Sequence, residues 1–87
     1  MNITIPANLI KEYLREKFEE FRERNSEFLV NSIFYDDHKF HMSINMETGL
    51  WQDFKAQETG NFYHLISLLE GISYSEAVRK INKKLLN

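Results

Sequence analysis

Aromatic side chains must supply most of the core of this chain, because it contains no cysteine for a disulfide or a thiolate metal site. A chain of 87 residues buries only about 60–65 % of its unfolded surface. Seven Phe, four Tyr and one Trp are available, and each buries roughly 150–250 Å². We therefore expect a single domain over residues 1–87, closed around one aromatic core without a cofactor.

The first part of the chain, residues 1–26, is predicted to be a long helix. Apolar residues recur at helical spacing from Ala7 to Arg24, and charges of both signs fill the opposite face. The stripe consists of Leu9, Ile10, Tyr13, Leu14, Phe18 and Phe21. We expect this stripe to pack on the core, with Tyr13 and Phe21 as candidate contacts for a partner protein.

The middle of the chain, residues 27–56, is predicted to form a three-stranded antiparallel sheet. The segments 27–34, 39–46 and 50–55 are rich in β-forming residues that alternate with polar ones. The face expected to be buried carries Phe40, Met42, Ile44, Met46, Leu50 and Phe54. The face expected to be polar carries His41, Ser43, Asn45, Trp51, Asp53 and Lys55.

Residues 60–87 are predicted to form two helices. Gly60 and Asn61 start the first, and Gly71 supplies the left-handed residue that ends it. Ser73 to Glu76 is a capping-box pattern that starts the second. The predicted fold is therefore α+β: a small three-stranded antiparallel sheet, zinc-ribbon-like but without metal, with one N-terminal and two C-terminal helices.

The polar sheet face suggests contact with single-stranded nucleic acid. Trp51 would stack on a base, while Lys39 and Lys55 touch phosphates beside His41. The alternative is a solvated face with Trp51 covered by a helix. Arg79 and Lys83 of the last helix are further candidate phosphate contacts, although such a run is more often a solvated face near the helix C-terminus.

Catalysis and metal binding have little support in the sequence. His38 and His41 stand close to Asp36 and Asp37, but no compact ligand set completes them. The three glycines are scattered, so no phosphate-binding loop is formed. We expect a protein that is not an enzyme; a small enzyme built on the histidines is the least favoured alternative.

Several short motifs occur in the order typical of one family. They are Ser32-Ile33-Phe34-Tyr35, then Gly49-Leu50-Trp51-Gln52-Asp53-Phe54-Lys55-Ala56, then Gly60-Asn61 and Tyr74-Ser75-Glu76-Ala77. Over residues 32–81 the chain resembles the zinc-ribbon domain of bacterial-type DNA primases. The resemblance places the four zinc ligands of the family at Ser32, Tyr35, Asp53 and Ala56. Such residues do not make a structural zinc site. We expect no zinc, with Ser32, Tyr35 and Asp53 hydrogen-bonded or at the surface.

The resemblance implies a role in primer synthesis and a sheet that contacts the template. The function expected is a non-catalytic accessory subunit that binds a polymerase or primase catalytic chain and helps it engage single-stranded DNA. A phage or other mobile element is the expected origin. The alternative is a pure protein–protein adapter or inhibitor of a replication protein, which the net charge of −2 favours. No segment resembles a signal peptide or membrane span, so we expect a cytoplasmic protein without a membrane partner.

Overall fold

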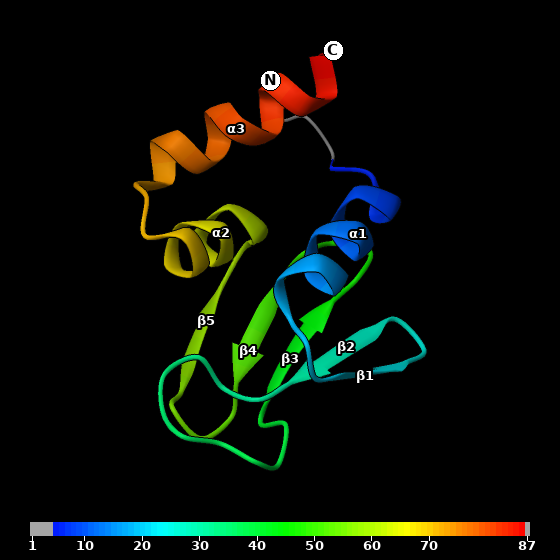
Figure 1. Cartoon of the computed structure of the whole chain (residues 1–87), viewed down its shortest axis with the longest axis vertical. Coiled ribbons are helices and arrows are strands. Elements are labelled where there is room, and N and C mark those ends of the chain that lie inside the picture. The colour runs from blue at the N-terminus through cyan, green and yellow to red at the C-terminus, as the bar shows by residue number, and fades with distance from the viewer. Residues whose placement is uncertain (1–4, 87) are drawn as a thin grey trace.

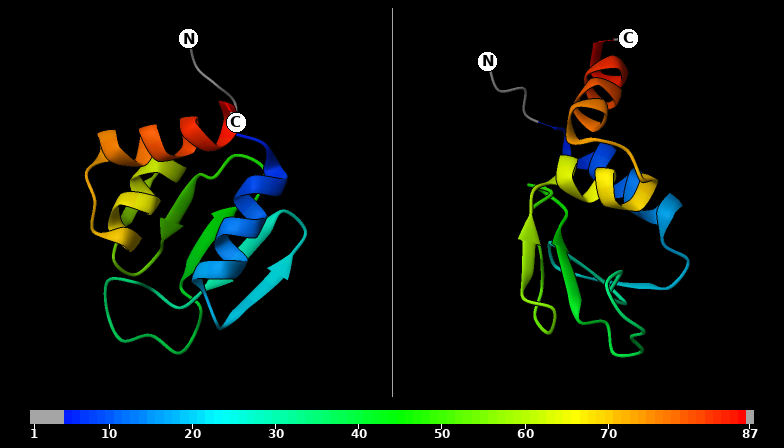
Figure 2. Two further views of the ribbon diagram at one scale, coloured as in Figure 1. Left: turned by 45° about the horizontal axis from the view of Figure 1, so that its top comes forward. Right: turned by 90° about the vertical axis from the view of Figure 1, so that its left-hand side faces the viewer.

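A computed structural model describes residues 5–86, which form one five-stranded sheet with three helices on one side, of which the last packs against the second. The strands follow one another as an antiparallel meander in the order β1-β2-β3-β4-β5 (Figure 1). The helices gather on one side of this sheet, and no helix of the described residues crosses the other side (Figure 2). The elements are α1 (Ala7–Lys17), β1 (Phe21–Arg24), β2 (Glu27–Val30), β3 (Met42–Asn45), β4 (Trp51–Asp53), β5 (Glu58–Gly60), α2 (Phe62–Glu70) and α3 (Tyr74–Leu86).

The prediction of a three-stranded sheet is wrong, because both edges of the sheet carry a further strand. At one edge, the helix expected to reach Arg24 ends at Lys17, and residues 21–24 pair with β2 as β1. Asn25, with a φ of 55°, lies in the two-residue turn between these strands. At the other edge, residues 58–60 pair with β4 where a connection between sheet and helix was expected.

The helical spacing of Phe18 and Phe21 has another origin. Both rings lie beside Phe28 of β2, with centroid distances of 6.1 and 4.7 Å, although neither residue is helical. Phe21 is stacked on Phe28 from the neighbouring strand, where it faces Val30. The spacing of these two apolar residues therefore reflects their contact with the same core residue. An extended segment can make that contact as well as a helix can.

The two sides of β4 are the reverse of those predicted. Trp51 and Asp53 point into the core, while Leu50 and Phe54 are exposed. The pairing with β3 sets this orientation, because Trp51 lies opposite the buried Ile44 and Asp53 opposite the buried Met42. A shift of one residue exchanges the two sides of a strand. The sequence predicts that residues of β4 alternate between the two sides, but it assigns each residue to the wrong side.

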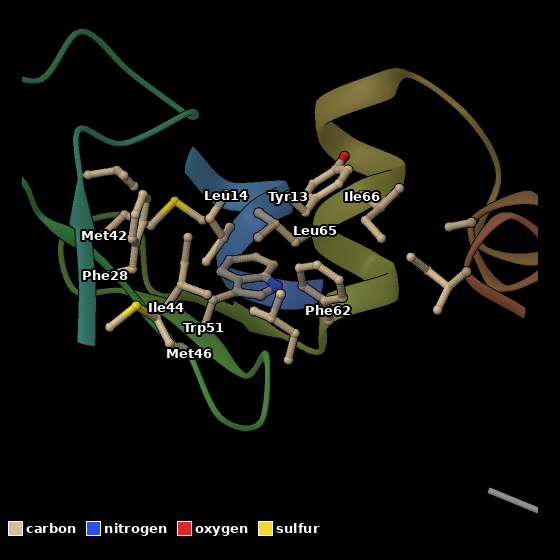
Figure 3. Close-up of a cluster of buried hydrophobic side chains, with 14 residues drawn as sticks. Tyr13, Leu14, Phe28, Met42, Ile44, Met46, Trp51, Phe62, Leu65 and Ile66 are labelled. Carbon is tan, nitrogen blue, oxygen red and sulfur yellow. The ribbon is translucent and has the colours of Figure 1, made fainter. Parts of the chain in front are cut away.

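Trp51 lies at the centre of the core between the sheet and α2 (Figure 3). Its side chain is 2 % exposed, and its indole Nε1 donates a hydrogen bond of 2.9 Å to the carbonyl oxygen of Asn61. The neighbouring Phe62 meets Tyr13 of α1 edge to face, with ring centroids 5.4 Å apart. The rings of Trp51, Phe62 and Tyr13 thus connect β4, the start of α2 and α1.

The two C-terminal helices are where the sequence predicted them. The side chain of Asn61 accepts a hydrogen bond from His64 N, and Gly71 ends α2 with a φ of 66°. The Ser73 hydroxyl accepts a hydrogen bond from Glu76 N at 3.1 Å. None of the helices within residues 5–86 has the length and apolar character needed to cross a membrane.

Glu70, at the end of α2, ties the three helices together. Its carboxylate accepts a hydrogen bond of 2.5 Å from the Tyr13 hydroxyl of α1 and pairs with Lys80 of α3. Lys17 lies 3.8 Å from the same carboxylate. Burial and the adjacent Glu70 raise the pKa of Tyr13 well above its ordinary value. Tyr13 therefore remains a neutral donor and holds α1 against α2.

The position of Trp51 predicts a large difference between two neighbouring substitutions. Trp51→Ala should lower the free energy of unfolding by about 3–5 kcal/mol, since it removes a fully buried ring and leaves a cavity. Leu50→Ala, at an exposed neighbour, should change it by less than about 0.5 kcal/mol. Urea denaturation followed by circular dichroism measures both. Similar losses for the two variants would contradict the orientation of β4, and Trp51→Phe provides a milder variant if Trp51→Ala does not fold.

Candidate nucleic-acid interface

The side of the sheet away from the helices is formed mainly by polar residues, with Leu29, Leu50 and Phe54 as apolar exceptions. The register places Ser43, Gln52 and Thr59 side by side across three strands. Beside them, Asn45 N donates to the carbonyl oxygen of Leu50, and Phe54 N donates to that of His41. We call this side the open face: it comprises Arg22, Arg24, Glu27, Leu29, His41, Ser43, Asn45, Leu50, Gln52, Phe54 and Thr59.

Three residues of the open face follow one another along β4 and its ends. Leu50, Gln52 and Phe54 alternate with the buried Trp51 and Asp53, and successive members are therefore about 6.6 Å apart. Leu50 is 57 % exposed and Phe54 is 63 % exposed. An exposed aromatic ring on a rigid strand is a suitable surface for stacking a base.

Basic side chains gather where the 31–41 loop meets the turn after β4. The Lys55 ammonium lies 5.0 Å from the centre of the Tyr35 ring, and this ring lies 6.2 Å from that of His41. Lys39 is exposed two residues before His41. These four residues, Tyr35, Lys39, His41 and Lys55, form what we call the loop end. The backbone hydrogen bond between Phe54 and His41 places the exposed Phe54 directly beside it.

The carboxylate of Asp37 holds the 31–41 loop in place. It accepts hydrogen bonds from the backbone N–H groups of Ser32, Lys39 and His41 at 2.9–3.0 Å, and lies 2.8 Å from His41 Nδ1. Burial of this carboxyl acts to raise its pKa, but the hydrogen bonds outweigh it and hold the pKa well below the usual range. The ionised Asp37 therefore fixes the backbone from which Lys39 and His41 project. Between these two residues, Phe40 has a φ of 52°.

Asp53 plays the same part for the turn after β4. Its Oδ1 accepts hydrogen bonds from Lys55 N at 3.0 Å, Ala56 N at 2.8 Å and the Tyr35 hydroxyl at 3.3 Å. Its burial, at 1 % exposure, acts to raise its pKa, yet these hydrogen bonds bring the pKa below its ordinary value. Its Oδ2 is buried and has no hydrogen-bond partner within residues 5–86.

The four positions that we aligned with zinc ligands on the basis of the resemblance all make local hydrogen bonds. Tyr35 and Ala56 both donate to Asp53, while the Ser32 hydroxyl accepts a hydrogen bond from Phe34 N at 3.0 Å. We expected Ser32, Tyr35 and Asp53 to be hydrogen-bonded or at the surface, and all three are hydrogen-bonded. Within residues 5–86, no group of three His, Cys, Asp or Glu side chains is placed to hold a metal ion.

The remaining predicted site residues lie elsewhere. Trp51 was expected on the polar face and is in the core, so it offers no ring for stacking. Arg79 and Lys83 line a shallow groove on α3 with Lys80, at the opposite end of the molecule from the loop end (Figure 1). Tyr13 is buried, and its hydroxyl is bound to Glu70. Phe21 is half-buried against Phe28.

Leu50, Gln52 and Phe54 were missed as surface residues because the sequence did not determine which side of β4 faces the core. One signal was present. Asp53 is followed by Lys55 and Ala56, whose N–H groups it accepts, and such local side-chain bonding is typical of Asp at a turn. A tryptophan also gains more from burial than a leucine. Both considerations favour Trp51 and Asp53 on the same, inner side.

Comparison of the chain with protein-family models, with curated proteins and with solved structures finds no match. The resemblance to the zinc-ribbon domain of primases therefore rests on the sequence motifs alone.

The lowered pKa values of Asp37 and Asp53 predict acid sensitivity. A carboxyl whose pKa is lower in the folded state stabilises the fold above its ordinary pKa of 3.8 and loses this effect as the pH falls through the folded value. Asp53→Asn should therefore cost about 1–3 kcal/mol at neutral pH and weaken the pH dependence in acid. Urea denaturation at several pH values measures this. Asp36→Asn, at an exposed carboxylate, is the control, and an equal effect there would contradict the role of Asp53.

Proposed function

We propose that this chain is a non-catalytic accessory subunit that holds single-stranded nucleic acid on its open face and presents it to a separate catalytic chain. The observation that supports this most strongly is the exposed ring of Phe54, whose backbone N–H donates to the carbonyl oxygen of His41 in the loop end that also carries Lys39 and Lys55. Stacking rings next to cations are the usual elements of sites for single strands. They occur here on backbone that Asp37 and Asp53 fix in place.

The sequence suggests in which cellular process such a subunit would act. The motifs shared with the zinc-ribbon domain of bacterial-type primases favour primer synthesis, with a polymerase or primase catalytic chain as partner. Within this surface, Phe54 takes the stacking role that we had assigned to Trp51. Lys39, His41 and Lys55 keep the roles predicted for them. Arg79 and Lys83 lie apart, in a groove on α3 that Glu70 and Glu76 also line.

The structure also favours a binding role over a catalytic one. The carboxylate of Asp37 is engaged by three backbone N–H groups and by His41, which leaves it poorly placed to act as a general base. The side chains of Asp36 and His38 are largely exposed, and Asp36 Oδ1 lies 3.5 Å from His38 Nε2. An exposed pair of this kind lacks the enclosed pocket in which catalytic groups are usually found.

A protein–protein adapter without nucleic-acid contact is the second candidate. It is favoured by the net charge of −2 and by the exposure of Leu50 and Phe54, which are apolar. In that case the same surface would contact a protein, and binding to a purified catalytic chain would persist without oligonucleotide. Binding of the isolated chain to a labelled oligonucleotide separates the two candidates.

Phe54→Ala should weaken binding of fluorescent single-stranded DNA roughly tenfold, because stacking on an aromatic ring contributes about 1–3 kcal/mol per base. Fluorescence anisotropy at low salt measures the affinity. Leu68→Ala, at an exposed apolar residue on α2, is the matched control and should leave affinity unchanged. Emission of the buried Trp51 verifies that each variant is folded. Equal affinity of Phe54→Ala and the unaltered chain would contradict the proposed surface.

Lys39→Ala and Lys55→Ala should each reduce the dependence of affinity on salt. Each phosphate contact with a single strand contributes about 0.7 to the slope of log K against log salt concentration. Lys11→Ala, on α1, is the control for a change of one charge. An unchanged slope for both loop-end variants would show that these lysines do not contact phosphate.

A further inference from the structure

We propose that a hollow in the open face is a subsite selective for guanine; this inference rests on the proposed binding of nucleic acid. The hollow has a volume of about 320 Å³ and opens to solvent beside β4. It is lined by Glu27, Ser43, Asn45, Leu50, Trp51, Gln52 and Thr59. It lies along β4, and Phe54 directly follows β4, so an oligonucleotide with one base stacked on Phe54 can place a neighbouring base in the hollow.

The carboxylate of Glu27 gives the hollow its selectivity. Glu27 lies opposite Asn45 in the β2–β3 register, and its Oε1 accepts a hydrogen bond of 3.3 Å from the Ser43 hydroxyl. This hydroxyl is the only hydrogen-bond donor to the Glu27 carboxylate within the described residues, although Arg24 lies opposite Glu27 in the β1–β2 register. An ionised carboxylate is an acceptor only, with room for several donors. It therefore favours a base edge that carries adjacent N–H groups.

The other polar groups of the hollow are oriented by their internal hydrogen bonds. Asn45 Oδ1 accepts from the N–H groups of Glu47 and Thr48 at 2.8 and 3.0 Å, so the amide NH₂ remains as a donor. Thr59 uses its hydroxyl proton on the carbonyl oxygen of Trp51 at 2.7 Å. Leu50 adds an apolar wall. The hollow thus combines an acceptor at Glu27 with a donor at Asn45.

Guanine fits this arrangement better than the other bases. Its Watson–Crick edge has two adjacent donors, N1–H and the N2 amino group, which can both reach one carboxylate, and its O6 accepts. Adenine and cytosine offer one amino group beside an acceptor nitrogen. Thymine and uracil offer a single N–H between two carbonyl oxygens, which a carboxylate repels. A paired contact of this kind discriminates between bases by about tenfold at an accessible site.

The test compares short oligothymidines that differ at one central position, with affinity measured by anisotropy. A central guanine should bind about tenfold more tightly than thymine, and hypoxanthine, which lacks the N2 amino group, should lose most of this gain. Glu27→Gln should abolish the preference while retaining affinity for oligothymidine. Glu58→Gln, an equal change of charge on β5, should preserve the preference.

The outcomes distinguish this inference from the proposed function. Binding without a preference for guanine, or a preference that survives Glu27→Gln, would overturn the guanine subsite alone. If no oligonucleotide binds, the proposed function fails. The hollow is then tested by titrating guanosine monophosphate and thymidine monophosphate while following the amide resonances of Ser43 and Gln52. Shifts with the guanine nucleotide only would support the subsite as one for free nucleotide, and equal or absent shifts would overturn it.

Discussion

The inward position of Trp51 is the constraint on which the rest of the structure depends. Its ring fills the space between the sheet and α2, and its hydrogen bond to the Asn61 carbonyl fixes the point at which α2 begins. Because side chains alternate along a strand, burial of Trp51 also carries Asp53 inward and turns Leu50, Gln52 and Phe54 outward. The composition of the open face therefore follows from the packing of one residue in the core.

Two buried carboxylates hold the 31–41 loop and the turn after β4 in place through local hydrogen bonds. Asp37 and Asp53 each accept several N–H groups from neighbouring backbone, and the Tyr35 hydroxyl connects the loop to the turn. Such bonds to an ionised acceptor are stronger than those between neutral groups. They fix the backbone from which Lys39, His41 and Lys55 project, and a backbone hydrogen bond joins Phe54 to His41.

Much of the architecture could be predicted from the sequence, for reasons that differ from one element to another. Both C-terminal helices carry cap residues, Asn61 and Ser73, whose side chains make the expected bonds. The segment 21–24 was wrongly assigned to a helix, because the position of Phe21 fits the spacing of a helical apolar stripe and also its contact with Phe28 from the neighbouring strand. Strand β5 has only three residues and no apolar alternation, so its pairing with β4 depends on tertiary structure. In the candidate site, the sequence names the lysines of the loop end, whereas the exposure of Phe54 follows only from the register of β4.

A net charge of −2 does not conflict with binding to nucleic acid, because the acidic groups near the open face differ in what they are free to do. Asp37 and Asp53 are buried and bound to N–H groups, so they act as structural acceptors beneath the surface. Glu27 remains accessible in the hollow, where its charge opposes phosphate but favours a base with two adjacent donors. Lysines at the loop end and a carboxylate in the hollow would thus orient a strand, with its phosphates towards Lys39 and Lys55 and a base towards Glu27. A surface that was uniformly basic would bind more tightly but would not set this orientation.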